Sequence, residues 1–394
     1  MEENYYIDIN CQLKNHAEER VCGDVFLSKR IREEDRIVVV LSDGLGHGIK
    51  ANLLATLTAT LASSFIEEHK SVQKIAESLI NTLPVDEDKG LNYSTFTIVD
   101  IYPGGEIIIL EYENPPTLIF RGSKRIEPAW NCVLLEGDRH SGKEVLTATL
   151  HACKGDRIVF CTDGVVQSGL GGERYQLGWG IGDLESYVSD SIHEDQAMSS
   201  YKLASKVINK ANQNDNFHAK DDISCAVIYF RDPRKLMICT GPPEDVSKDG
   251  EYAAMLKEFS GKKVICGATT VDIIARELEL KVIDHPVIFD TDLPPASMME
   301  GVDLVTEGIL TLSKVNELLK SYNHNYKFSR GPADQIVKMI LGSDEIQFIV
   351  GTKINVAHQD PSLPVELELR RTVVHRITRV LEEKFLKKVS MKFY

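Results

Sequence analysis

Two apolar segments of the chain end in the same way, and this shared ending limits the possible folds more than any other feature. The segment "RIVVVLSDG" ends in an Asp-Gly pair at Asp43, and "RIVFCTDG" ends in another at Asp163. Continuous apolar runs of this kind predict buried strands. A third segment, "DDISCAVIYF", begins with Asp221 and Asp222. If this strand lies antiparallel to one of the others, its start and their ends share one edge of a sheet.

A fourth carboxylate joins this edge by the same geometry. The segment "GDVFLSK" starts at Asp24, and a hairpin that turns at "REED" sets Asp24 opposite Asp43. Four carboxylates at one edge repel each other strongly unless cations or protons lie among them. Ligation by aspartates, carbonyl groups and water suits Mg²⁺ or Mn²⁺ rather than zinc. The alternative is that each Asp-Gly pair is only a turn, which four acids at one edge disfavour.

The first two thirds of the chain reads as strands, then helices, then strands. Residues 49–69, 71–83 and about 195–212 have helical spacing. Alternating or apolar runs predict strands at "IDINCQL", "STFTIVDIY", "EIIILEYE", "PTLIFRG" and "EVLTATLHA". Many antiparallel strands with helices grouped between them predict an α+β fold rather than repeated βαβ units.

After "RDPRK" the pattern changes, which predicts a domain boundary near residues 231–235 and hence domains 1–231 and 232–394. Short apolar strands now alternate with helices, a rhythm typical of a parallel sheet. The second domain is therefore expected to be a smaller, Rossmann-like α/β accessory domain. The strands expected there are "KLMICTG", "KKVICGATT", "HPVIFDTD" and "EIQFIVGTK".

Charge and cysteine usage exclude several classes of function. A net charge of −14 argues against binding to nucleic acid or to an anionic membrane surface. The start of the chain has no signal-peptide pattern, and no apolar run approaches the roughly 20 residues that span a bilayer. The eight cysteines are scattered without a C-x-x-C pair, which predicts reduced thiols in a cytoplasmic protein.

The acidic motifs, taken in order, resemble a known enzyme family. "GD", "SDGLGHG", "CTDGVVQS" and "KDDIS" are similar to the motif series of PPM-type (type 2C) metal-dependent serine/threonine protein phosphatases, SpoIIE-like bacterial branch. The resemblance covers roughly residues 1 to 230. It implies a four-layer αββα β-sandwich, two divalent metal ions (Mn²⁺ or Mg²⁺) at one end, and hydrolysis of phosphoserine or phosphothreonine on a regulatory protein in a signalling pathway.

The resemblance also implies a role for each acidic position. Asp43 would bridge both metal ions, and the Gly44 carbonyl would bind one of them. Asp163 and Asp222 would hold the other ion, and Asp24 would bind directly or through water. A hydroxide between the ions would attack the phosphorus atom, because the metals lower its pKa and neutralise charge on the phosphate.

Three neighbouring positions carry further expectations. Gly46 and Gly48 let the backbone bend tightly into a helix. Eukaryotic members of the family have a proposed acid two residues after the bridging aspartate, where this chain has Leu45; His47 is therefore not expected to be the catalytic acid, and its ring is expected to point away from the metals. Arg20 stands where many relatives have a phosphate-binding arginine, although a solvated arginine at a strand end explains it equally well.

The accessory domain has three strand endings in which glycine stands beside threonine. In a parallel sheet such endings line one crevice, and helix N-termini there attract anions. Ordinary strand-to-helix turns are the competing interpretation. The residues predicted for a small anionic ligand are Gly241, Gly267, Thr269, Thr270 and Gly351.

The sequence thus predicts a cytoplasmic, metal-dependent protein phosphatase. One alternative is a phosphatase-like binding or scaffolding module whose accessory domain senses a small anionic ligand. Intact Asp43, Asp163 and Asp222 count against that alternative. Another is a two-metal nuclease or phosphodiesterase, which fits the acids but not the order of the motifs.

Overall fold

The computed structural model describes residues 5–31, 33–67, 74–75, 77–79, 85–86, 91–92, 94–134, 144–284, 293–323, 326–353, 366–385 and 387–394. The chain forms two compact units, Met1–Asp232 and Pro233–Tyr394. Each unit has its own buried cores, which is the property that defines a domain.

The first unit contains two antiparallel sheets. One sheet has the order β1-β13-β12-β8-β9, with bounds Tyr6–Lys14, Ile223–Arg231, Asp156–Cys161, Leu118–Arg121 and Lys124–Ile126. The other has the order β10-β11-β7-β6-β3-β2, with bounds Trp130–Leu134, Glu144–His151, Glu106–Tyr112, Ser94–Ile101, Arg36–Gly44 and Val25–Ile31. The short strands β4 (Val85–Asp86) and β5 (Leu91–Asn92) pair with each other, and η1 (Pro103–Gly105) is a short turn of 3₁₀-helix.

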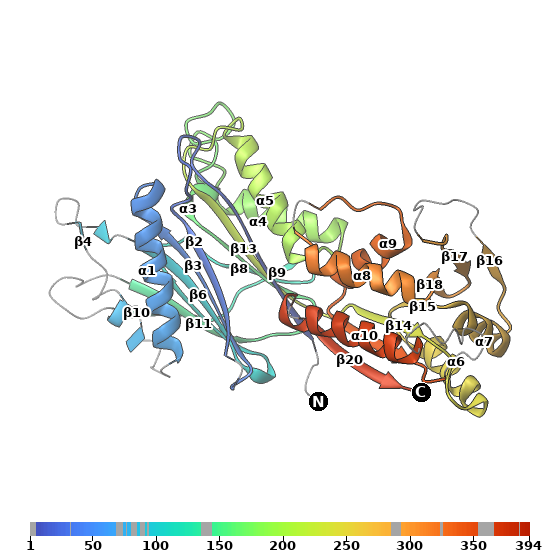
Figure 1. Cartoon of the computed structure of the whole chain (residues 1–394). Helices are drawn as coiled ribbons and strands as arrows, with labels where there is room; N and C mark the ends of the chain where they lie inside the picture. Colours follow the sequence, from blue (N-terminus) through green and yellow to red (C-terminus); the bar gives the residue numbers. More distant parts are fainter. Residues whose placement is uncertain are drawn as a thin grey trace. The chain divides into compact units, whose positions relative to one another are not determined.

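Helices cover the outer faces of the two sheets and produce the predicted αββα order (Figure 1). Helix α1 (Gly48–Glu67) packs on the sheet that contains β3, whereas α3 (Asp163–Val166), α4 (Ile181–Glu194) and α5 (Ser200–Asn214) cover the other sheet. Alternate residues of β3 serve different layers, because side chains of a strand point to opposite faces. Val38 and Val40 face α1, while Val39 and Leu41 pack between the sheets.

Helix α1 is the one helix of the described residues that is long and apolar enough to cross a membrane, with a mean hydropathy of 1.3 over its most apolar window. The sequence was expected to contain no such segment. Core helices of globular proteins pass the same test, and Ala51, Ala55 and Ala59 of α1 are fully buried. The small size of these side chains lets the helix lie close to the sheet. Of the apolar stripe expected in residues 71–83, Ile75 and Leu79 are described and join the same core.

The second unit is built on one seven-stranded sheet of order β16-β17-β18-β15-β14-β19-β20. The five strands from β18 to β20 are parallel to one another, as predicted, whereas β17 pairs antiparallel with both β16 and β18. The bounds are Val282–Asp284, Ser297–Met299, Val302–Thr306, Lys262–Cys266, Lys235–Thr240, Glu345–Val350 and Lys388–Phe393. The expected strand "HPVIFDTD" lies outside the described residues, and β18 and β20 were not foreseen.

Helices flank both faces of this sheet (Figure 1). Helices α6 (Asp249–Glu258) and α7 (Ala268–Leu278) pack on one face. Helices α8 (Ile309–Ser321), α9 (Pro332–Leu341) and α10 (Glu366–Glu383) pack on the other. A short 3₁₀ turn, η2 (Val246–Lys248), leads into α6.

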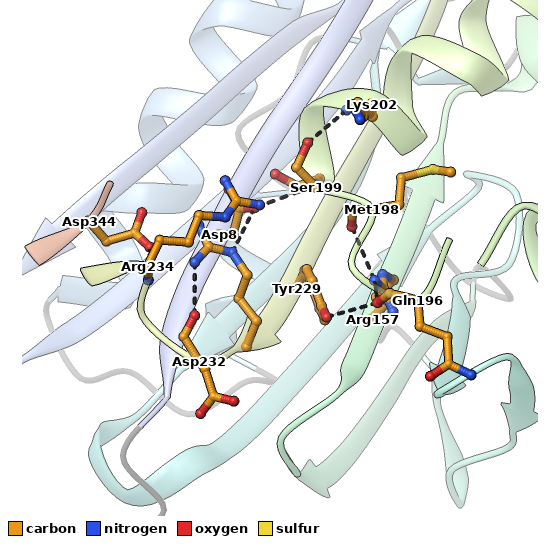
Figure 2. A network of polar contacts seen from close by, with 12 residues as sticks. Asp8, Arg157, Gln196, Met198, Ser199, Lys202, Tyr229, Asp232, Arg234 and Asp344 are labelled. Carbon is orange, nitrogen blue, oxygen red and sulfur yellow. Dashed lines mark hydrogen bonds and ion pairs between the residues drawn. The ribbon is translucent and has the colours of Figure 1, made fainter. Parts of the chain in front are cut away.

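A buried arginine fixes the loop between α4 and α5 to the first unit's sheet. The Arg157 guanidinium lies 3.6 Å from the ring centroid of Tyr229 and donates hydrogen bonds to the carbonyl groups of Gln196 (2.8 Å) and Met198 (3.1 Å). The Tyr229 hydroxyl donates to the same Gln196 carbonyl, as Figure 2 shows. Burial lowers the pKa of Arg157. The cost of burying this cation is offset by the two carbonyl groups and the aromatic face.

We therefore expect Arg157→Met to lower the free energy of unfolding by about 2 kcal/mol, because the Met198 carbonyl loses its charged donor. Urea unfolding followed by circular dichroism measures this change. The matched control is Arg174→Met, which removes an exposed arginine that lies over the Tyr175 ring and should change the stability by less than about 0.5 kcal/mol. Equal stabilities of the two variants would contradict the anchoring role of Arg157.

Candidate metal centre

The strand register gathers the predicted acids at one end of the sandwich. Strands β2 and β3 pair with Val25 opposite Ser42, so Asp24 stands opposite Asp43, as predicted. Strands β12 and β13 pair with Cys161 opposite Cys225. Asp163 therefore follows the end of one strand, while Asp221 and Asp222 precede the start of the neighbouring strand. Both antiparallel pairings bring acids from different parts of the sequence to the same end.

A cavity of about 310 Å³ opens at this end. Three carboxylates line it, together with one lysine, one histidine and the leucine that follows the Asp-Gly pair. These residues are Asp43, Asp163, Asp221, Lys220, His47 and Leu45. Gln167 Nε2 donates to Asp163 Oδ2 at 2.7 Å, and Ser94 Oγ donates to the Asp43 carbonyl at 2.7 Å. Neighbouring polar groups thus hold two of the three acidic residues in place.

Of the adjacent acids Asp221 and Asp222, the predicted metal ligand Asp222 is the one that does not line the cavity. The two carboxylate oxygens of Asp222 accept hydrogen bonds from the backbone N–H groups of His16 and Gly23, each at 2.9 Å. Asp222 is only 2% exposed and does not line the cavity, whereas the adjacent Asp221 does. The structure therefore places Asp221 in the cavity and Asp222 outside it. Asp222 instead ties the segment before β2 to the start of β13.

Asp24 lies buried behind the cavity. Its Oδ2 accepts hydrogen bonds from Thr162 Oγ1 (2.8 Å) and Ser224 Oγ (2.5 Å). Its Oδ1 is also buried without a donor among the described residues, although the carboxyl groups of Asp24 and Asp43 are within hydrogen-bonding reach of each other when one of them is protonated. A buried carboxylate oxygen without a donor is costly unless a cation or a proton lies beside it.

The pKa values show the strain of placing these acids together. Burial raises the pKa of Asp24 to about 7, although hydrogen bonds from Ser224 and Thr162 oppose the shift. Burial, followed by the charges of Asp24 and Asp163, raises the pKa of Asp43 well above its usual value. Burial and the charge of Asp163 raise the pKa of Asp221 to about 6. Without cations, the cluster therefore retains protons close to neutral pH.

The donor chemistry fits hard divalent cations. All three acidic groups that line the cavity are aspartates, and oxygen donors suit Mg²⁺ or Mn²⁺. No three Asp, Glu, His or Cys side chains of the described residues already converge closely enough to hold an ion. The fit consequently rests on the charge of the cluster, its raised pKa values and the orphaned Asp24 oxygen.

Glycines allow the backbone segments of the site to approach closely. A Cβ atom on Gly44 would lie 2.0 Å from the carbonyl oxygen of Ala51 in α1, and one on Gly164 would lie 2.1 Å from the carbonyl oxygen of Asp222. Gly46 and Gly48 have φ angles of 90° and 73°, which glycine adopts readily. The expected bend at Gly46 and Gly48 is confirmed, and Gly44 is needed because there is no room for a side chain.

The basic residues of the site differ from the prediction. Arg20 is exposed and does not line the cavity. Lys220, which sequence reasoning passed over, does line it, and its Nζ donates to the Leu170 carbonyl at 2.7 Å. The signal for Lys220 was present in "KDDIS", because the residue before a cavity-lining acid at the start of a strand lies at the same sheet end.

The His47 ring contacts residues that do not line the cavity. His47 itself lines the cavity, and its Nδ1 lies 2.8 Å from Glu19 Oε1. Its ring stacks on the His16 ring with centroids 4.7 Å apart. The side chain is 54% exposed, so the cavity is open to solvent on this side.

The residues predicted for a ligand of the second unit are mostly brought together. Four of them, Gly241, Gly267, Thr269 and Thr270, line a separate cavity at the sheet edge of that unit. Gly351 does not line it, but its carbonyl accepts a hydrogen bond from Arg370, which does.

Comparison with known proteins assigns the first unit to a class. The profile of the family described as stage II sporulation protein E (SpoIIE) matches residues 33–231, just over half of the chain. The chain belongs to the SpoIIE family. No curated protein matches the chain.

Solved structures that resemble the chain are distant. The phosphatase domain of the cell fate determinant SpoIIE from Bacillus subtilis is 16% identical over 58% of this chain and 93% of its own, with a TM-score of 0.41. The RsbU and RsbW domains of Rv1364c from Mycobacterium tuberculosis are 18% identical over 64% of this chain and 67% of their own, with a TM-score of 0.46. At these scores the family match alone supports the assignment.

The raised pKa of Asp24 leads to a testable pH dependence in metal-free protein. An ordinary aspartate has a pKa near 3.9, so between about pH 4 and 7 the folded protein binds more protons at Asp24 than the unfolded chain does. Stability therefore falls as pH rises through this window. The side chain in Asp24→Asn cannot titrate. The melting temperature of this variant minus that of the wild type should therefore increase from pH 5 to 7.5 in chelator; this difference is called the gap below.

Differential scanning calorimetry at several pH values measures this gap. Asp190→Asn is the control, because Asp190 is an exposed acid of α4 outside the site, and its gap should stay constant with pH. A gap for Asp24→Asn that is equally independent of pH would show that Asp24 is ionised throughout the window.

Proposed function

We propose that residues 1–231 form a metal-dependent protein phosphatase that hydrolyses phosphoserine or phosphothreonine on a regulatory protein. The observation that carries this proposal is the cavity in which Asp43, Asp163 and Asp221 stand beside Lys220, in a chain of the SpoIIE family. Residues 232–394 form the accessory domain.

Two divalent ions, Mn²⁺ or Mg²⁺, would be held by Asp43, the Gly44 carbonyl, Asp163 and Asp221, with Asp24 behind them. When bound, such ions activate water as a nucleophile and neutralise charge on a phosphate group. The orphaned Oδ1 of Asp24 supports its inclusion, since a cation nearby would compensate for the missing donor.

Residues in and around the cavity would position the substrate and the acids. Lys220 offers a cation to the phosphate oxygens, and Gln167 orients Asp163 through its amide. Asp222 keeps Asp221 in place because its own carboxylate is fastened to His16 and Gly23. The exposure of His47 leaves one side open, which a phosphorylated protein segment requires.

The competing proposal, a binding module without activity, is disfavoured by the same cavity. A scaffold has no need for three acids that repel each other, whereas an enzyme that uses cations does. We also propose a cytoplasmic location, because all eight cysteines are free thiols.

Activity should require Mn²⁺ or Mg²⁺ and the acids that line the cavity. We expect Asp163→Asn and Asp221→Asn each to lower kcat/KM on a phosphoserine peptide by about 10³-fold. Each would remove a ligand of a metal ion that stabilises the transition state. Phosphate release with and without Mn²⁺ is the measurement, and circular dichroism checks the fold. Asp190→Asn, which removes an exposed acid elsewhere, should keep full activity.

Asp222→Asn separates the two assignments of the ligand. It should lower the melting temperature, because the amide nitrogen cannot accept one of the two backbone N–H groups that Asp222 now binds. Full activity in chelator, or in the Asp221→Asn variant, would refute the proposed metal centre.

Lys220 and Arg20 form a matched pair for the phosphate contact. Lys220→Met should raise KM for a phosphopeptide about tenfold with a smaller change in kcat, since a charge-assisted hydrogen bond contributes about 1.5 kcal/mol. Arg20→Met removes an equally exposed cation that does not line the cavity and should change KM less than about twofold. If Arg20→Met raised KM and Lys220→Met did not, the phosphate contact would be assigned to Arg20 instead.

A further inference from the structure

The second unit contains a crevice of the kind at which open α/β sheets bind ligands. Its five parallel strands stand in the order β18-β15-β14-β19-β20, which in chain order is the third, second, first, fourth and fifth. The chain leaves β15 into α7 on one face of the sheet and leaves the neighbouring β18 into α8 on the opposite face. The strand order reverses between β14 and β19, and ligands of open α/β sheets bind outside the carboxyl ends of the strands near such a reversal.

A cavity of about 150 Å³ lies at this edge, between the carboxyl ends of β14, β15 and β18. A space of this size suits a phosphate group with a few attached atoms, and the rest of a larger ligand would extend outward.

Two helix N-termini meet at the cavity. Helices α7 and α8 begin after Gly267 and Gly308, and neither has a side chain that caps its first N–H groups. A Cβ atom on Gly308 would lie 3.3 Å from Gly267 Cα, so the two turns are close together. The first turn of each helix leaves N–H groups unpaired and carries partial positive charge, which together attract an anion.

A buried hydroxyl group points independently to a missing ligand. Thr270 is fully buried and lines the cavity, and its Oγ1 has no hydrogen-bond partner among the described residues. The Oγ1 is directed towards the start of α7, because it lies 3.4 Å from the place that a Cβ on Gly267 would take. An unpartnered buried hydroxyl destabilises a fold, and a ligand oxygen at this position would remove that cost.

Two charged residues also line the cavity and limit which chemical groups a ligand can carry there. Arg370 of α10 lines the cavity and donates from Nη1 to the Gly351 carbonyl at 3.2 Å. Glu307, which follows β18, also lines it, and its Oε2 is buried without a donor among the described residues. A free phosphate would be attracted by the charge of the arginine but would offer the buried carboxylate no donor. A phosphate that carries hydroxyl groups would satisfy both.

We propose that this cavity binds a small phosphorylated ligand with hydroxyl groups, such as a sugar phosphate or a nucleotide. The phosphate lies at the starts of α7 and α8, where it accepts hydrogen bonds from backbone N–H groups, the Thr270 hydroxyl and Arg370. A hydroxyl group of the ligand donates to Glu307. The site belongs to the second unit alone and does not depend on the proposed phosphatase activity.

Binding is measured by isothermal titration calorimetry on the full chain that carries Asp163→Asn, in chelator, so that the first unit's site is disabled. The probes are ribose 5-phosphate, AMP, inorganic phosphate and ribose. We expect ribose 5-phosphate or AMP to bind at least tenfold more tightly than inorganic phosphate, and ribose not to bind. Glu307→Gln should reduce that advantage.

The sharpest variant is Thr270→Val, which keeps the shape of the side chain and removes the hydroxyl. We expect it to weaken binding at least tenfold without lowering the melting temperature of the ligand-free protein. Thr311→Val is the matched control: Thr311 stands at the same position of α8, is equally buried and has an equally unpartnered hydroxyl, but does not line the cavity. It should bind like the parent.

Three results would overturn the proposal. The first is that none of the phosphorylated probes binds. The second is that Thr270→Val binds as tightly as Thr311→Val. The third is that ribose competes equally with ribose 5-phosphate, because the site would then recognise the sugar rather than the phosphate.

Discussion

The repulsion among buried aspartates is the constraint around which the first unit is arranged. Asp24 and Asp43 face each other across a strand pair, and burial raises the pKa of both. Such a cluster persists in a folded protein only if the surrounding structure is firm enough to hold it. Two features hold the cluster in place. One is the apolar core between the sheets, and the other is the pair of hydrogen bonds that Asp222 accepts from the backbone N–H groups of His16 and Gly23. Repulsion among these carboxylates therefore destabilises the folded protein, and bound cations would reduce that repulsion.

Much of the fold could be predicted because hydrophobic period and turn chemistry act locally. Most strands of the sandwich, helix α1, the hairpin that sets Asp24 opposite Asp43 and the parallel pairing in the second unit follow from such patterns, whereas β9 and β10 were not foreseen. Helix α4 could not be foreseen, because its start lies in a glycine-rich segment that reads as a loop. Strands β18 and β20 were missed because polar residues interrupt them, and their place in the sheet depends on distant partners.

The candidate site was predictable only as far as the residues that lie within regular strands. Asp221 and Asp222 are adjacent, and the sequence does not reveal which of them faces inward. That choice depends on N–H groups some 200 residues away, at His16 and Gly23. Arg20 and Lys220 are both exposed cations next to motif residues, and the loops around the cavity decide that Lys220 lines it and Arg20 does not.

The two units collect opposite charges for a common physical reason. Strands that are buried on both faces leave polar groups only at their ends. In the antiparallel sandwich, one end combines strand ends with strand starts, and aspartate side chains gather there although helices α1 and α3 also begin at this end. In the parallel sheet, the carboxyl edge is also where the helices begin, so the backbone itself supplies positive potential. The first edge is therefore suited to cations, and the second is suited to an anion before any side chain is considered.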